Sequence, residues 1–172
     1  MRKFTQKDKQ KRGAKGESLI TDSLRKAGLW NHKLINAGYG TVFDKIIIPP
    51  SGGFGIEIKV RQVPRIAYNT KSITPNERRG LDEFMKLVGR DNVFIIGIWK
   101  TEEFQRAFLI PWYQVRDQVL SGVRGSINML DFPEIKKQGN YLDLSFFSNY
   151  KILLQNLQKF KISKFDGQEL WD

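Results

Sequence analysis

Residues 42–61 read VFDKIIIPPSGGFGIEIKVR, two apolar segments joined by a stretch of proline, serine and glycine. The stretch PPSGG at 49–53 is typical of a tight turn, and the segments on either side have the apolar character of β-strands. We therefore predict a β-hairpin in which a strand over 41–48 pairs with a strand over 54–61. A hairpin with this much apolar surface predicts a β-sheet at the centre of the fold.

Asp44 is unusual in this hairpin, because strands with a buried face rarely contain Asp. Glu57 and Lys59 share one face of the second strand by alternation. A four-residue turn places Asp44 opposite Glu57, and a five-residue turn places it opposite Ile58. Facing carboxylates repel each other, so a divalent cation, a shared proton or Lys59 must offset the repulsion. A purely structural ion pair between Glu57 and Lys59 is the alternative interpretation.

The charge of the chain predicts a polyanion as its partner. The 172 residues include 29 Lys and Arg against 18 Asp and Glu, a net charge of +11. Residues 1–100 contain 20 basic and nine acidic residues, and residues 101–172 contain nine of each, so the excess lies entirely in the first part. Such one-sided positive charge is typical of nucleic-acid binding. Six basic residues and one acid lie within residues 1–12, where we expect a flexible basic tail.

The composition excludes several kinds of site. The chain has no cysteine and one histidine, His32, which excludes disulfides, Cys–zinc sites, thiol nucleophiles and a Ser–His–Asp triad. No apolar run approaches the roughly 18 residues of a membrane span. The basic start leads into further charge rather than into the apolar core of a signal peptide. We therefore expect an intracellular protein without a membrane segment.

Regular patterns extend on both sides of the hairpin. Thr74 and Glu77 form the sequence signature of a capping box, with Pro75 at the first helical position. The tryptophans at 30, 99 and 112 are predicted to lie in the core. We predict helices over 13–28, 74–89 and 149–160, a short helix from 111, and strands over 29–35, 92–99, 105–110 and 141–147, with an irregular segment over 122–138. This order indicates the α/β class, with a mixed sheet flanked by helices in a single domain over 13–172 that ends in a helical extension.

The acidic and basic residues together match a family pattern. Gly16-Glu17, Asp44 and Glu57-Ile58-Lys59 resemble the motif of the PD-(D/E)xK nuclease superfamily, and within it the Holliday junction resolvases of the RecU type. The supporting features run from about residue 13 to residue 111. The resemblance implies a restriction-endonuclease-like fold and a homodimer that cleaves DNA at branched junctions in recombination and repair. It also implies a bacterial cytoplasm, with the gene carried by a bacterium or a phage.

The resemblance implies a role for each matched residue. Glu17, Asp44, Glu57 and the main-chain carbonyl of Ile58 would bind Mg²⁺, for which Mn²⁺ is a substitute, and Lys59 would assist the attacking water. From the residues alone, two carboxylates suit Mg²⁺, whereas Glu17 is equally explained as an acid at a helix start.

Two other functions stay open. One is a less selective restriction- or nicking-type DNA endonuclease on the same fold, and the other is a DNA- or RNA-binding module without catalysis. Cleavage of a four-way junction and of a plain duplex separates these three functions. Seven basic residues are candidates for contacts with DNA phosphates: Lys15, Lys33, Arg61, Arg65, Lys71, Arg78 and Arg79.

Overall fold

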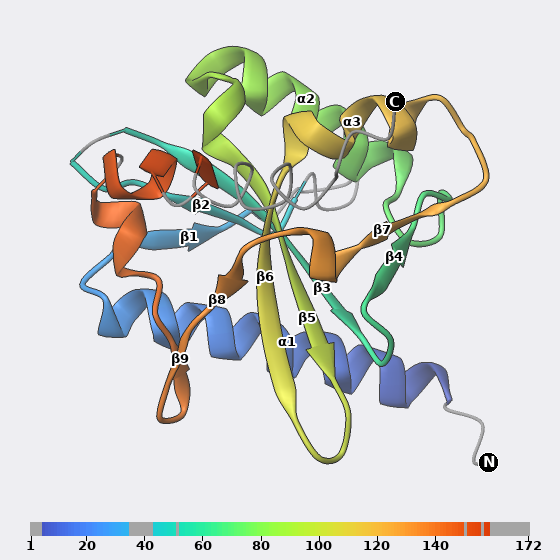
Figure 1. Cartoon of the computed structure of the whole chain (residues 1–172), viewed down its shortest axis with the longest axis horizontal. Helices are drawn as coiled ribbons and strands as arrows, with labels where there is room; N and C mark the ends of the chain where they lie inside the picture. The colour runs from blue at the N-terminus through green and yellow to red at the C-terminus, as the bar shows by residue number, and fades with distance from the viewer. Residues whose placement is uncertain (1–4, 35–42, 51, 150, 156, 159–172) are drawn as a thin grey trace, which may run out of the picture.

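A computed structural model describes residues 5–34, 43–50, 52–149, 151–155 and 157–158. Its centre is a six-stranded sheet with the strand order β1-β2-β3-β5-β6-β8 (Figure 1). Strands β3 and β5 pair in parallel, and the other neighbours in this sheet pair antiparallel. The predicted mixed sheet is therefore confirmed. Its strands are β1 (Asn31–Lys33), β2 (Lys45–Ile47), β3 (Phe54–Arg61), β5 (Val93–Lys100), β6 (Gln105–Pro111) and β8 (Glu134–Ile135).

The register of the hairpin follows the shorter of the two predicted turns. Lys45 lies opposite Ile56 and Ile47 lies opposite Phe54, and the same register continued by one residue places Asp44 opposite Glu57. Strand β3 has the predicted bounds, but β2 is only three residues long. The main-chain N–H of Ile58 donates to the carboxylate of Asp44, which marks the point where the ladder ends. Of the predicted strand over 41–48, residues 41 and 42 lie outside the described residues.

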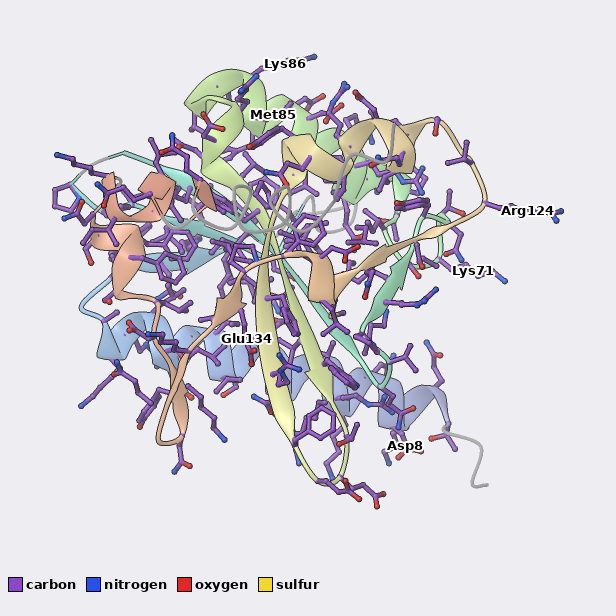
Figure 2. All side chains as sticks on the ribbon, viewed as in Figure 1. Asp8, Lys71, Met85, Lys86, Arg124 and Glu134 are labelled. Atoms are coloured by element: carbon purple, nitrogen blue, oxygen red, sulfur yellow. The ribbon has the colours of Figure 1, made fainter. Side chains whose placement is uncertain are left out.

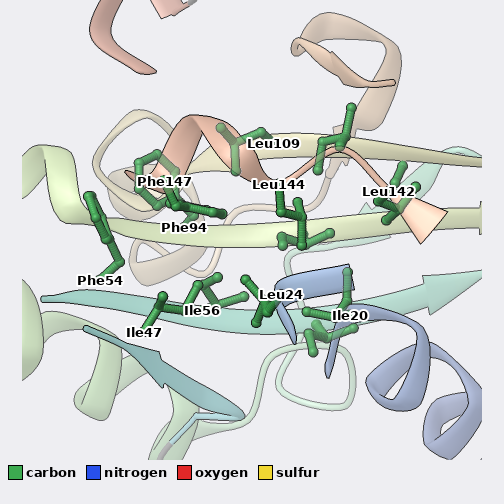
Figure 3. Packing of buried hydrophobic residues seen from close by; sticks show 14 of the residues in the cluster. Ile20, Leu24, Ile47, Phe54, Ile56, Phe94, Leu109, Leu142, Leu144 and Phe147 are labelled. Carbon is green, nitrogen blue, oxygen red and sulfur yellow. The ribbon is translucent and has the colours of Figure 1, made fainter. Parts of the chain in front are cut away.

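Helices cover both faces of the sheet. Helix α1 (Gln6–Lys26) packs on one face, and α2 (Pro75–Val88) and α3 (Trp112–Leu120) pack on the other. Alternate residues of β5 separate the two cores, because successive side chains of a strand point to opposite faces. Ile96 belongs to the core under α1 with Ile20 and Leu24, part of which Figure 3 shows. Ile95 belongs to the core under α2 and α3.

The two long helices begin at capping boxes. The box of Thr74 and Glu77 is present as predicted, and α2 follows it. Helix α1, however, begins at Gln6 rather than at residue 13, because Thr5 and Asp8 form a second capping box. The prediction of a tail over residues 1–12 is therefore wrong for residues 6–12, which are the first turns of α1.

Three further predictions are corrected. Trp30 is 57 % exposed, because it stacks on the ring of His32 at the edge of the sheet rather than entering the core. The predicted strand over 141–147 is reduced to β10 (Tyr141–Leu142), since a 3₁₀ helix over Ser145–Ser148 carries Phe147 into the core. The segment over 122–138 is not irregular throughout. It contains β7 (Ser126–Asn128), a 3₁₀ helix over Met129–Asp131, β8 and β9 (Lys137–Gln138). Strand β7 pairs with β4 (Arg65–Ala67), and β9 pairs with β10.

The described residues 151–155 and 157–158 are helical, and both ranges lie within the helix predicted over 149–160. A further 3₁₀ helix over Arg90–Asn92 links α2 to β5. None of the helices in the described ranges combines the length and the apolar character that a membrane crossing needs.

Candidate active site

The hairpin carries Glu57 and Lys59 on the face of the sheet that α2 covers. Glu57 is 2 % exposed and Lys59 is 8 % exposed. The ammonium of Lys59 lies 2.7 Å from Oε1 of Glu57. The other oxygen, Oε2 of Glu57, is buried and has no hydrogen-bond partner among the described residues. An unpaired buried carboxylate oxygen is costly, so this atom marks a place where a cation is favourable.

Burial and neighbouring charges change the pKa values of both acids. Burial, reinforced by the charge of Asp44, raises the pKa of Glu57 well above its usual value, against the opposing effect of Lys59. Burial also raises the pKa of Asp44 to about 6, although the 2.7 Å hydrogen bond from the Ile58 N–H lowers it. The charge of Asp44 therefore acts on Glu57 across the hairpin, as the register predicts.

Lys59 has a second carboxylate partner. Its Nζ lies 2.9 Å from Oε2 of Glu77, the third residue of α2. Burial lowers the pKa of Lys59, but the charges of Glu57 and Glu77 outweigh burial and leave the pKa above its usual value. Lys59 is therefore held as an ammonium ion. Sequence reasoning missed Glu77 as a neighbour of the site, because its capping-box position already explained an acid there.

Glu17 lies on α1, in the layer on the other side of the sheet, and its carboxylate pairs with Lys33 of β1. Its charge still raises the pKa of Asp44, so the two acids are electrostatic neighbours. Among the described residues, no three His, Asp or Glu side chains are grouped closely enough to hold a metal ion. Asp44 and Glu57 are the pair that this structure brings together, and Glu17 as a third ligand stays a prediction.

No family model and no curated protein sequence matches this chain. Among solved structures, the Holliday junction resolvase Hjc from Archaeoglobus fulgidus matches with a TM-score of 0.45 and 17 % identity, over 70 % of this chain and 92 % of that one. The bacterial homing endonuclease I-Ssp6803I matches with a TM-score of 0.42 and 13 % identity, over 94 % of this chain and 99 % of that one. With both TM-scores below 0.5, the function of this chain has to be inferred from its own residues.

Several of the basic residues predicted to contact DNA are already engaged within the protein. The guanidinium of Arg78 donates to the main-chain carbonyls of Tyr68, Ile73 and Val119. Arg61 donates to the carbonyls of Val60 and Ser72, Lys33 pairs with Glu17, and Arg79 donates to Asn76. Arg79 is nevertheless exposed, as are four more of the seven: Lys15, Lys33, Arg65 and Lys71.

A basic hollow lies beside the first turn of α2. It has a volume of about 390 Å³, and none of its lining residues is acidic. Lys71 and Arg124 project from this side of the molecule (Figure 2). Arg124 is exposed and was not among the predicted contact residues. The lining residues are Tyr68, Asn69, Thr70, Arg78, Gly122, Val123, Arg124 and Gly125.

Proposed function

We propose that this chain is a metal-dependent endodeoxyribonuclease that hydrolyses phosphodiester bonds of branched DNA, as a homodimer acting on four-way junctions in recombination and repair. The observation that carries the proposal is the pairing of buried Glu57 with half-buried Asp44, with the Lys59 ammonium beside Glu57. Two neighbouring carboxylates and an ammonium group form a site for a divalent cation next to a phosphate. The excess positive charge of residues 1–100 suits the polyanionic substrate.

The residues present fit a divalent cation. Oε2 of Glu57 is buried without a hydrogen-bond partner among the described residues, and burial raises the pKa values of both Asp44 and Glu57. Raised pKa values mean that the two anions are unfavourable in the protein alone, and a cation between them relieves that cost. In this proposal Asp44, Glu57 and the carbonyl of Ile58 hold Mg²⁺, or Mn²⁺ in its place, and Glu17 joins them after releasing Lys33. The bound cation would lower the pKa of a water and polarise the phosphate.

Lys59 supplies a fixed positive charge at the site. Because two carboxylates keep its Nζ protonated, we assign it to stabilising the charge that develops on the phosphate rather than to removing a proton. Its position two residues beyond Glu57 on the same strand face keeps it next to the proposed cation.

The test compares a labelled four-way junction with a duplex of the same arm sequence, each incubated with Mg²⁺, Mn²⁺ or EDTA. The variants are Asp44→Asn and Lys59→Ala, and the matched control is Glu83→Gln, which removes one exposed charge from α2. We expect the wild type and the control to cleave the junction only with metal, and both site variants to lose cleavage. Cleavage of every substrate indicates the less selective endonuclease. Salt-sensitive binding without cleavage indicates the binding module.

A further inference from the structure

Glu77 contacts the site from a different layer of the protein. Its Oε2 lies 2.9 Å from Nζ of Lys59, and the side chains of Lys59 and Glu77 are 10 % and 19 % exposed. The contact joins the third residue of α2 to the middle of β3. Lys59 is thus held between two carboxylates, Glu57 on its own strand and Glu77 on the covering helix.

The carboxylate of Glu77 is itself fixed by the start of the helix. Its Oε2 accepts a hydrogen bond from the main-chain N–H of Thr74 at 2.8 Å, and its own N–H donates to Oγ1 of Thr74 at 3.3 Å. These reciprocal bonds set the rotamer of Glu77. A lysine side chain has many rotamers in isolation. The Nζ of Lys59 is restricted to one position by Oε1 of Glu57 at 2.7 Å and Oε2 of Glu77 at 2.9 Å.

Glu57 and Glu77 cannot both compensate the charge of Lys59 once a divalent cation binds. In the proposed function Glu57 is a ligand of the cation, so its charge is no longer available to the ammonium. A buried ammonium beside a cation is unfavourable unless another anion compensates it. Glu77 is the remaining anion in contact with Lys59 among the described residues.

We propose that Glu77 is a positioning residue, whose carboxylate holds the Lys59 ammonium at the reacting phosphate while Glu57 binds the cation. This inference rests on the proposed nuclease function. The competing explanation gives Glu77 only the structural task of capping α2. The two explanations differ in their chemical requirement, because a cap needs a hydrogen-bond acceptor and positioning of an ammonium needs a negative charge.

Glu77→Gln separates these requirements, since the amide oxygen still accepts from the Thr74 N–H while the charge is lost. We expect the single-turnover rate of junction cleavage to fall about tenfold to a hundredfold. The affinity for the junction, measured in EDTA, and the melting temperature are expected to change little. Glu83→Gln, the same substitution at an exposed position of α2, is expected to keep the rate within about twofold.

A double-mutant cycle tests whether Glu77 acts through Lys59. If it does, Glu77→Gln lowers the rate in the wild type but has no further effect in the Lys59→Ala variant. An unchanged rate for Glu77→Gln overturns the proposal, and so does an equal loss in both backgrounds. A wild type that cleaves no DNA instead overturns the proposed nuclease function, a result that is distinct from either of these.

Chemical labelling tests the contact without DNA. We expect acetic anhydride to modify Lys59 several-fold faster in Glu77→Gln than in the wild type, with the exposed Lys71 as internal reference in each digest. Glu83→Gln is expected to leave the ratio of the two lysines unchanged. An unchanged ratio in Glu77→Gln would show that Glu77 does not hold Lys59, and would overturn the proposal.

Discussion

The carboxylate of Asp44 accepts a hydrogen bond from the main-chain N–H of Ile58 at 2.7 Å. This bond ties the first acid of the site to Ile58, the residue that separates Glu57 from Lys59 on β3. The relative position of the three groups is therefore set by the register of β2 and β3 rather than by side-chain rotamers alone.

Asp44→Asn is expected to stabilise the metal-free protein at neutral pH. Burial raises the folded-state pKa of Asp44 to about 6, whereas an unfolded chain has an Asp pKa of about 3.9. The folded state therefore binds this proton more tightly, and the free energy of unfolding decreases as the pH rises through the interval between the two values. The substitution removes this cost and should raise the free energy of unfolding at neutral pH by about 1–2 kcal/mol.

Urea unfolding in EDTA measures this effect. The gain from Asp44→Asn should shrink as the pH falls from about 6 and disappear below about pH 3, where the wild-type carboxyl is protonated in both states. A variant that is less stable than the wild type at neutral pH would contradict the assignment of a half-buried carboxylate whose charge is unfavourable.

Mg²⁺ and Mn²⁺ are expected to raise the melting temperature of the wild type in the absence of DNA. A ligand that binds only the folded state adds about 2.7 kcal/mol of stability at a concentration one hundred times its dissociation constant. Asp44→Asn and Glu57→Gln should abolish this stabilisation, and Glu83→Gln should retain it. The effect should weaken as the pH falls through about 6, because Asp44 must lose its proton to bind the cation. Equal metal-induced shifts in all four proteins would exclude Asp44 and Glu57 as ligands.

The contact between α1 and β3 predicts a strong effect of a single methyl group. A Cβ atom added at Gly16 would lie 2.3 Å from Cγ2 of Val60, whereas one added at Gly13 of the same helix has no neighbour within 4 Å. We expect Gly16→Ala to lower the free energy of unfolding by about 1–3 kcal/mol through overpacking. Gly13→Ala, the matched control, should raise it by about 0.5–1 kcal/mol through helix propensity. Chemical denaturation checks both values, and equal effects at the two glycines would show that α1 does not pack closely on β3.

The parts of the fold that could be predicted from the sequence are those with local signals. The PPSGG turn limited the hairpin to two registers, and the capping box at Thr74 located the start of α2. The contact between Glu77 and Lys59 had no such signal, because it joins two layers through side chains 18 positions apart. Alternation over 141–147 was misleading, since a 3₁₀ turn also buries Phe147.

Arg78 is expected to contribute to stability rather than to DNA affinity. Its guanidinium satisfies three main-chain carbonyls, of which that of Val119 belongs to α3. Arg78→Ala leaves these part-buried acceptors without their donor, and should lower the free energy of unfolding by about 2–3 kcal/mol. Arg79→Ala, at the exposed neighbouring position, should change it by less than about 0.5 kcal/mol. Equal losses of stability in the two variants would contradict this assignment.

Arg124 is expected to contact a DNA phosphate from the basic hollow beside α2. It is exposed, it lines a hollow without acidic residues, and Lys71 projects from the same side of the molecule. Arg124→Ala should weaken junction binding and reduce the slope of log K against log salt by about 1, as the loss of one phosphate contact does. Arg106→Ala is the matched control, because Arg106 pairs with Glu134 at 2.8 Å and adds little net charge to its surroundings. Fluorescence anisotropy over a salt series measures both slopes, and a slope lowered equally in the two variants would place the DNA elsewhere on the surface.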